Sequence, residues 1–118
     1  MGTFSVRLQI ADPAGANFES FDALVDTGST YSVFPASVLQ RLGINPHRHS
    51  RFELGDGSVI ERDIGRTWVR YNGQTEMTLV VFGEEDVDPT LGAVTLEELQ
   101  LGVDPVAQTL FPLPRLLM

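Results

Sequence analysis

The residues best suited to chemistry lie in one short stretch, residues 23–30, with the sequence ALVDTGST. Its apolar start predicts the end of a buried strand, and Asp26 follows directly. A carboxylate in that position is costly to desolvate unless it is hydrogen-bonded or used. Gly28 allows a sharp turn, and Thr27 and Ser29 add hydroxyl groups. Such a loop can hold an acid in place and tune its affinity for a proton, as acid–base chemistry requires.

The segments around this loop are predicted to be β-strands. Residues 4–10 alternate apolar and polar side chains, which is typical of a half-buried strand. Residues 18–25 form a second strand that leads into the loop, and residues 31–34 form a third. These strands would present Asp26 from a sheet.

Two hairpins are predicted farther along the chain. Asn72 and Gly73 lie between apolar segments within residues 68–82, which is a strong short-range hairpin signal. A second hairpin is predicted over residues 52–62, where two short strands flank a Gly-Asp-Gly tip.

Two short helices are expected between the strands. Pro35 suits the first turn of one helix, and Gly43 ends it. Thr95 and Glu98 have the spacing of a capping box, and Gly102 would stop the second helix.

Residues 24–29 resemble the active-site loop of aspartic proteases, and a chain of 118 residues with one such loop resembles the retropepsin-like branch. Residues 90–93 stand where those chains carry a glycine before a helix, and residues 104–112 resemble the tail of bacterial members. The resemblance runs from about residue 4 to residue 112. It implies an all-β fold, a retropepsin-like acid-protease β-barrel with one or two short helices, as a single homodimeric domain over residues 1–118.

The resemblance also implies how the loop would work. Proteolysis by carboxylates needs two of them around a water, and this chain offers one such loop, so a homodimer would place Asp26 against the same residue of a second copy. Such a pair shares one proton and titrates as a unit. Thr27 would bond across the dimer, the Gly28 N–H would bond the Asp26 carboxylate, and Ser29 would bond the outer oxygen of that carboxylate.

In the same family, the hairpin that follows the acid loop is a flap over the substrate. Here its tip comprises Leu54, Gly55, Asp56, Gly57 and Ser58. An ordinary surface hairpin is the alternative interpretation, and no side chain of the tip is assigned a catalytic role.

The function predicted from these features is that of an aspartic endopeptidase acting on extended peptide or protein substrates. The alternative is a catalytically silent retropepsin-like module used for dimerisation or peptide binding, because a fold does not by itself give a function.

Composition narrows the choice of partners. The net charge of −8 disfavours nucleic acid and anionic membranes as partners. The chain has no cysteine, no run of apolar residues long enough to span a membrane and no recognisable signal peptide, so a cytoplasmic location is expected. No cofactor and no metal are expected: His47 with His49, and the acidic residues 84–88, are interpreted as solvated loops.

The last ten residues, 109–118, are too apolar to trail in water. Leu110, Phe111, Leu113, Leu116 and Leu117 would form an exposed patch of the kind that marks an interface. In the resembling family the two chain ends form an interchain sheet, so residues 4–10 and 106–113 are predicted to supply strands to the dimer interface.

Overall fold

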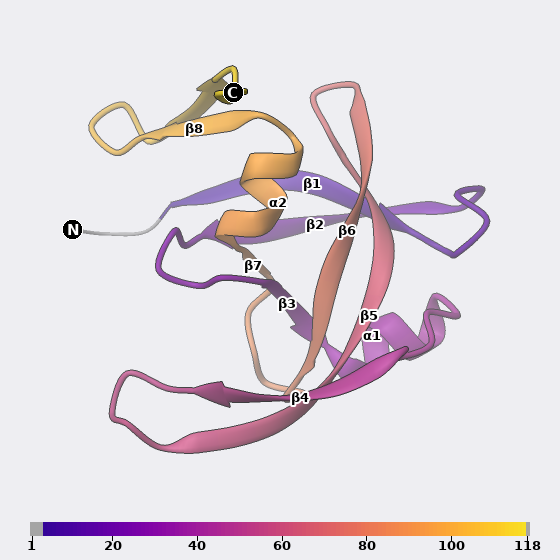
Figure 1. Ribbon diagram of the computed structural model, residues 1–118. Coiled ribbons are helices and arrows are strands. Elements are labelled where there is room, and N and C mark those ends of the chain that lie inside the picture. Colours follow the sequence, from indigo (N-terminus) through magenta and orange to yellow (C-terminus); the bar gives the residue numbers. More distant parts are fainter. Residues whose placement is uncertain (1–3, 118) are drawn as a thin grey trace.

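The computed structural model describes residues 4–117 and contains nine strands and two short helices in that part of the chain (Figure 1). The strands are β1 (Ser5–Ala11), β2 (Phe18–Val25), β3 (Ser32–Pro35), β4 (Arg48–Glu53), β5 (Val59–Tyr71), β6 (Gln74–Gly83), β7 (Thr90–Leu91), β8 (Leu101–Asp104) and β9 (Thr109–Pro112), and the helices are α1 (Ala36–Arg41) and α2 (Ala93–Glu98). The predicted all-β class with two short helices is confirmed.

Six of the strands close into a barrel. Seven strands share one sheet in the order β1-β2-β7-β3-β6-β5-β4, and β1 also pairs with β5, which joins the two ends of the first six. Closure leaves those strands few free edges. β5 is 13 residues long because it pairs with β4 at one end and with β6 and β1 farther along. The β4–β5 hairpin therefore extends beyond the barrel (Figure 1).

The barrel interior is filled by side chains that alternate along the strands. One buried cluster contains Leu8 and Ile10 of β1 together with Ala23 and Val25 of β2, and Leu39 of α1 also joins it. Each large apolar side chain buried in this way contributes about 1.5–3 kcal/mol. Residues 4–10 thus alternate as the sequence predicts, and β2, the predicted second strand, ends in the packed core just before Asp26.

The second helix differs from its predicted form. α2 begins at Ala93, its N-cap residue is Gly92 and no side chain caps it. Thr95 lies inside the helix with only 1% of its surface exposed. The predicted capping box is therefore wrong, because tertiary partners engage the Thr95 hydroxyl. Gly102 is also not the helix stop: it lies in β8.

The predicted hairpins and the first helix are present. Asn72 has φ 51° and Gly73 has φ 84°, which is the pair of left-handed residues that a two-residue turn of this type requires. α1 follows Pro35 and is six residues long, and Gly43 adopts φ 81° just after it.

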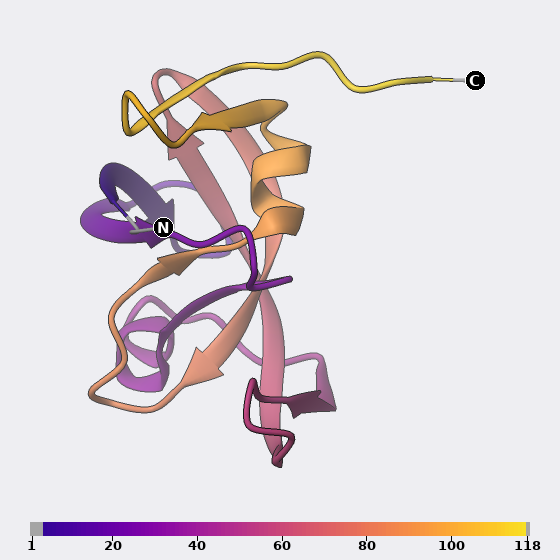
Figure 2. The same ribbon diagram turned by 90° about the vertical axis from the view of Figure 1, so that its left-hand side faces the viewer.

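The C-terminal residues form a separate layer beside α2. β8 pairs with β9 alone, as a two-stranded sheet. Gly102 packs closely under β9, since a Cβ at this position would lie 2.7 Å from the tip of the Phe111 ring and that ring would have to shift. Beyond β9, Arg115 donates hydrogen bonds to the carbonyls of Leu96 (3.3 Å) and Leu101 (2.7 Å). The tail then projects away from the rest of the molecule (Figure 2).

Candidate active site

Asp26 lies where β2 leaves the barrel, and the neighbouring β7–α2 segment holds its loop. β2 and β7 run parallel, and the Asp26 N–H donates to the Leu91 carbonyl at 3.0 Å. The first N–H groups of α2 then bind the loop: Ala93 donates to the Ser29 carbonyl at 2.8 Å and Val94 to the Thr30 carbonyl at 2.9 Å. The loop therefore has a fixed path over the start of α2.

Gly92 is required by this close approach. A Cβ at position 92 would lie 2.5 Å from the backbone of Tyr31 and 2.9 Å from the Ser29 carbonyl oxygen. Real Cβ atoms do not approach backbone so closely, so any other residue would displace the loop. The sequence signal for this position was the glycine within residues 90–93, and the structure supplies its physical reason.

The half-buried carboxylate of Asp26 has one of the two neighbours expected of it. The Gly28 N–H donates to Asp26 Oδ1 at 2.9 Å, as the sequence analysis expected. Ser29 differs, because its hydroxyl donates to the Tyr31 carbonyl at 2.8 Å and so serves the backbone of its own loop. The expected bond from Ser29 to the outer carboxylate oxygen is therefore wrong. Thr27 is exposed.

Three buried hydroxyl groups support the loop from below, and sequence reasoning missed them. Thr95 Oγ1 lies 2.6 Å from Ser32 Oγ and 2.7 Å from Thr78 Oγ1, so α2 is tied to both β3 and β6. The Gly92 N–H donates to Ser32 Oγ at 3.0 Å. Leaving one such buried group unpaired costs about 1–3 kcal/mol. The only signal in the sequence was that each of these polar residues stands at a position of a strand or helix that faces the core.

The tip of the β4–β5 hairpin, residues 54–58, is exposed and lies on the same side of the molecule as the Asp26 loop in both views (Figures 1 and 2). Gly57 closes the turn with φ 86° and donates to the Leu54 carbonyl at 2.9 Å. Asp56 accepts hydrogen bonds from the Ser58 hydroxyl and N–H, which lower the pKa of its carboxyl group.

Two cavities flank the Asp26 loop. One, of about 350 Å³, lies between the loop and the β4–β5 hairpin, and the Tyr31 and Phe52 rings in its lining meet edge to face with centroids 6.0 Å apart. The other, of about 440 Å³, lies on the side of α2 and β8 and is lined by Thr27 and the tail. The loop therefore faces two open spaces, one of which could take a ligand and the other a protein surface.

The family model for aspartyl proteases matches residues 13–103, which include the loop, the hairpin and α2. The chain belongs to the aspartyl protease family. Solved structures of this fold agree in architecture. EIAV protease in complex with the inhibitor HBY-793 matches with a TM-score of 0.59 and 19% identity, over 83% of this chain and 88% of that one.

Two further solved structures confirm the predicted retropepsin-like fold of this aspartyl protease domain. The retroviral protease-like domain of Ddi1 from Leishmania major has a TM-score of 0.56 and 18% identity, with 94% of this chain and 90% of that chain covered. Simian foamy virus (mac) protease has a TM-score of 0.54 and 14% identity, with 78% and 92% covered. A comparison of the sequence with curated proteins finds no match.

Other kinds of site find no support in residues 4–117 of the aspartyl protease domain. That part of the chain contains no group of three or more His, Cys, Asp or Glu side chains arranged to hold a metal ion. Within the same residues, no helix has the length and apolar character needed to cross a membrane.

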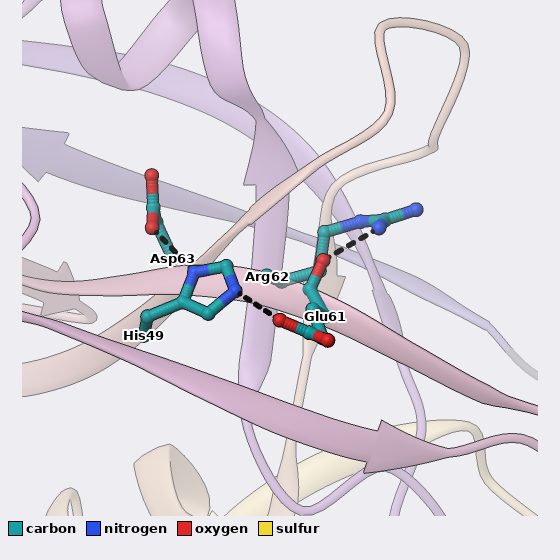
Figure 3. A network of polar contacts seen from close by, with 4 residues as sticks. All are labelled: His49, Glu61, Arg62 and Asp63. Atoms are coloured by element: carbon teal, nitrogen blue, oxygen red, sulfur yellow. Dashed lines mark hydrogen bonds and ion pairs between the residues drawn. The ribbon is translucent and has the colours of Figure 1, made fainter.

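A charged network lies on the β4–β5 hairpin, where His49 is placed between two carboxylates (Figure 3). His49 Nδ1 lies 2.9 Å from Asp63 Oδ1, and His49 Nε2 lies 2.9 Å from Glu61 Oε1. Both ring nitrogens can donate only when the imidazole is protonated. The hydrogen bond to Asp63, and next the one to Glu61, raise the pKa of His49.

We expect this network to make stability depend on pH. Because the pKa of His49 is raised in the folded state, its contribution is fully present below the pKa of an unfolded histidine, about 6.5, and is lost as pH rises through the folded value. Urea unfolding should therefore give wild type a higher free energy of unfolding than His49→Gln at pH 5.5. The two free energies should become equal by pH 9. In a Glu61→Gln/Asp63→Asn background, the same histidine substitution should have no such pH dependence; a persistent one would refute this origin.

Proposed function

We propose that this chain is an aspartic endopeptidase whose active site forms when two copies bring their Asp26 side chains together. The observation that carries the proposal is the placement of Asp26 at the end of β2, half-buried, with Oδ1 bonded to the Gly28 N–H and its loop fixed by α2. Residues 1–118 would act as one domain. Family membership supports protease-like chemistry, and the dimer and its dyad are the finer part of the proposal.

The chemistry follows from placing two carboxylates side by side. Two such groups about 3 Å apart cannot both ionise, so the pair holds one proton. The ionised partner accepts a proton from water, and that water attacks the peptide carbonyl carbon. The protonated partner donates to the carbonyl oxygen as negative charge develops there. The amine then leaves with a proton from the pair.

The exposed side of the loop supports a dimer. Thr27 is exposed and lines the cavity bounded by α2 and β8, so its hydroxyl can face a second copy. β1 pairs with β2 along its length and with β5 over residues 9–11, so most of its bonding capacity is used within the barrel. We therefore place the interface chiefly on β9 and the tail, and only at residues 4–8 of the N-terminal segment.

The experiment that tests the function is cleavage of a peptide library between pH 4 and pH 9. We expect hydrolysis at internal peptide bonds, fastest at acid pH and slower as the pair loses its shared proton. Cleavage that rises steadily from pH 5 to pH 9 would contradict the shared-proton mechanism. Peptide binding without cleavage at any pH would instead favour the silent binding module.

We further propose that residues 54–58 form a mobile flap that closes over bound substrate. Leu54 and the rest of the tip are exposed, and no atom lies within 4 Å of a Cβ built at Gly55 or Gly57. The tip is therefore free to move without breaking core contacts. Backbone groups of an extended peptide would pair with the hairpin, as in other recognition by strand addition.

Substitution at the tip should separate turnover from stability. Gly57 has φ 86°, a conformation that valine tolerates poorly, whereas Gly55 is free of that constraint. Gly57→Val should lower kcat/KM by roughly tenfold or more because the closed flap is misplaced. Its effect on stability should be smaller, because the strain is confined to one exposed turn that makes no core contacts. Gly55→Val is the matched control with a smaller expected effect. Equal losses of activity in the two variants would count against the flap.

A further inference from the structure

The cavity between the Asp26 loop and the β4–β5 hairpin combines an apolar interior with charged edges. Its walls include Val33, Phe52, Ile60, Val81 and Val87, from β3, β4, β5, β6 and the loop after β6. Its volume of about 350 Å³ falls within the range of ligand pockets. Gly28 and Ser29 of the catalytic loop also line it, so a side chain bound there would sit beside the reacting bond.

The charges that line this cavity do not balance. Glu53 and Glu84 are exposed carboxylates at the lining, and Arg62 is the cationic residue there. Arg62 is already engaged: one terminal nitrogen donates to the Glu61 carbonyl at 2.7 Å, and the other pairs with Glu84. Its side chain is 25% exposed, against 68% for Glu84. Because Arg62 pairs with Glu84, the lining has one carboxylate more than it has cations, and that carboxylate is the exposed Glu53.

We infer that this cavity selects a lysine or arginine side chain of the peptide substrate, an inference that rests on the peptidase function proposed above. The methylene stem of such a side chain would lie along the apolar walls, with its cationic head at the carboxylates of Glu53 and Glu84. A glutamate side chain would be repelled there, and a wholly apolar side chain would fill the walls but leave the Glu53 carboxylate without a partner. The net charge of −8 adds long-range attraction for basic peptides.

The test uses two series of peptides, one varied at the residue before the cleaved bond and the other at the residue after it. Within a series, the peptides differ only in having lysine, norleucine or glutamate at that residue. Norleucine keeps the length of lysine without its charge. At pH 6 and low salt, we expect kcat/KM to be higher for lysine than for norleucine by roughly fivefold at one position, and lowest for glutamate. The lysine preference should shrink as salt is raised.

Substitution of the two glutamates assigns the preference to this cavity. Glu53→Gln and Glu84→Gln should each lower the lysine-to-norleucine ratio by roughly two- to fivefold. Glu76→Gln removes the same charge from the far end of β6, roughly 20 Å away along the strand, and should leave the ratio unchanged. An equal ratio in wild type and both cavity variants, or an equal fall with Glu76→Gln, would overturn the inference.

A binding measurement separates this inference from the proposed function. In Asp26→Asn protein, the dissociation constants of the lysine and norleucine peptides can be compared by titration of intrinsic fluorescence without cleavage. Suppose that the lysine peptide binds more tightly than the norleucine peptide, and that adding Glu53→Gln to the Asp26→Asn protein removes this difference. That result supports the cavity assignment even if wild type cleaves nothing. Cleavage of norleucine and lysine peptides at equal rates, with equal binding, supports the peptidase and refutes the cavity assignment.

Discussion

Asp26→Asn should abolish peptide hydrolysis and leave a folded protein. The amide keeps the size of the carboxylate and an oxygen that can accept from the Gly28 N–H, which lies 2.9 Å from Oδ1. It cannot carry the shared proton or take one from water. Loss of that proton transfer should lower kcat by roughly a hundred- to ten-thousandfold, while the free energy of unfolding changes by about 1 kcal/mol or less.

The control for this substitution is Glu76→Gln, at the exposed far end of β6. Glu76 is exposed, so this change removes one surface charge without touching the loop or the segments assigned to the dimer interface. It should keep full activity. Measurement of kcat together with urea unfolding separates the outcomes: unaltered turnover in Asp26→Asn would refute the enzyme assignment, and unfolding of that variant would show that Asp26 is needed for the fold of its loop instead.

Local pattern was enough to predict most of the elements. Alternation marks residues 4–10 as a strand, and the apolar end of residues 18–25 marks the strand that leads to Asp26; the structure has them as β1 and β2. Asn72 and Gly73 adopt the left-handed turn that their types favour. These signals succeed because each depends on side chains close in sequence, where propensity and burial act together.

Features that depend on contacts between distant residues could not be predicted from the sequence. Thr95 has the spacing of a cap, but its hydroxyl is held by Ser32 and Thr78, which are 63 and 17 residues away. Ser29 was expected to face the carboxylate, and it bonds the Tyr31 carbonyl because α2 fixes the backbone of the loop. The closure of β1 on β5 is likewise a long-range pairing. A local motif cannot specify which partner a polar group will find across the barrel.

The tail carries the second large prediction, because the proposed mechanism needs two chains. Arg115 anchors the segment to the carbonyls of Leu96 and Leu101, but Leu116 and Leu117 beyond it are 93% and 90% exposed. Phe111 and Leu113 are also partly exposed on the same segment. Leu116 and Leu117 are almost fully exposed within the described residues, and a second copy would bury them.

Deleting residues 108–118 should therefore give inactive monomers or aggregates although Asp26 is intact. That deletion also removes β9, the partner of β8, so a gentler variant is needed. Leu116→Glu/Leu117→Glu changes only exposed side chains and should weaken dimerisation by roughly a hundredfold or more, since each buried leucine is worth about 1.5–3 kcal/mol. Ala14→Glu/Ala16→Glu adds the same two charges in the exposed β1–β2 loop and should remain dimeric.

The fraction of dimer, measured by sedimentation velocity, and the specific activity should then fall together. Wild type should lose specific activity on dilution below the dimer dissociation constant, and the leucine double variant should lose it at higher concentration, because a monomer holds only half of the proposed carboxylate pair. Raising the concentration of that variant should restore activity in proportion to the dimer. A monomer that cleaves peptides at any dilution would exclude the shared pair, since one chain supplies a single Asp26 loop.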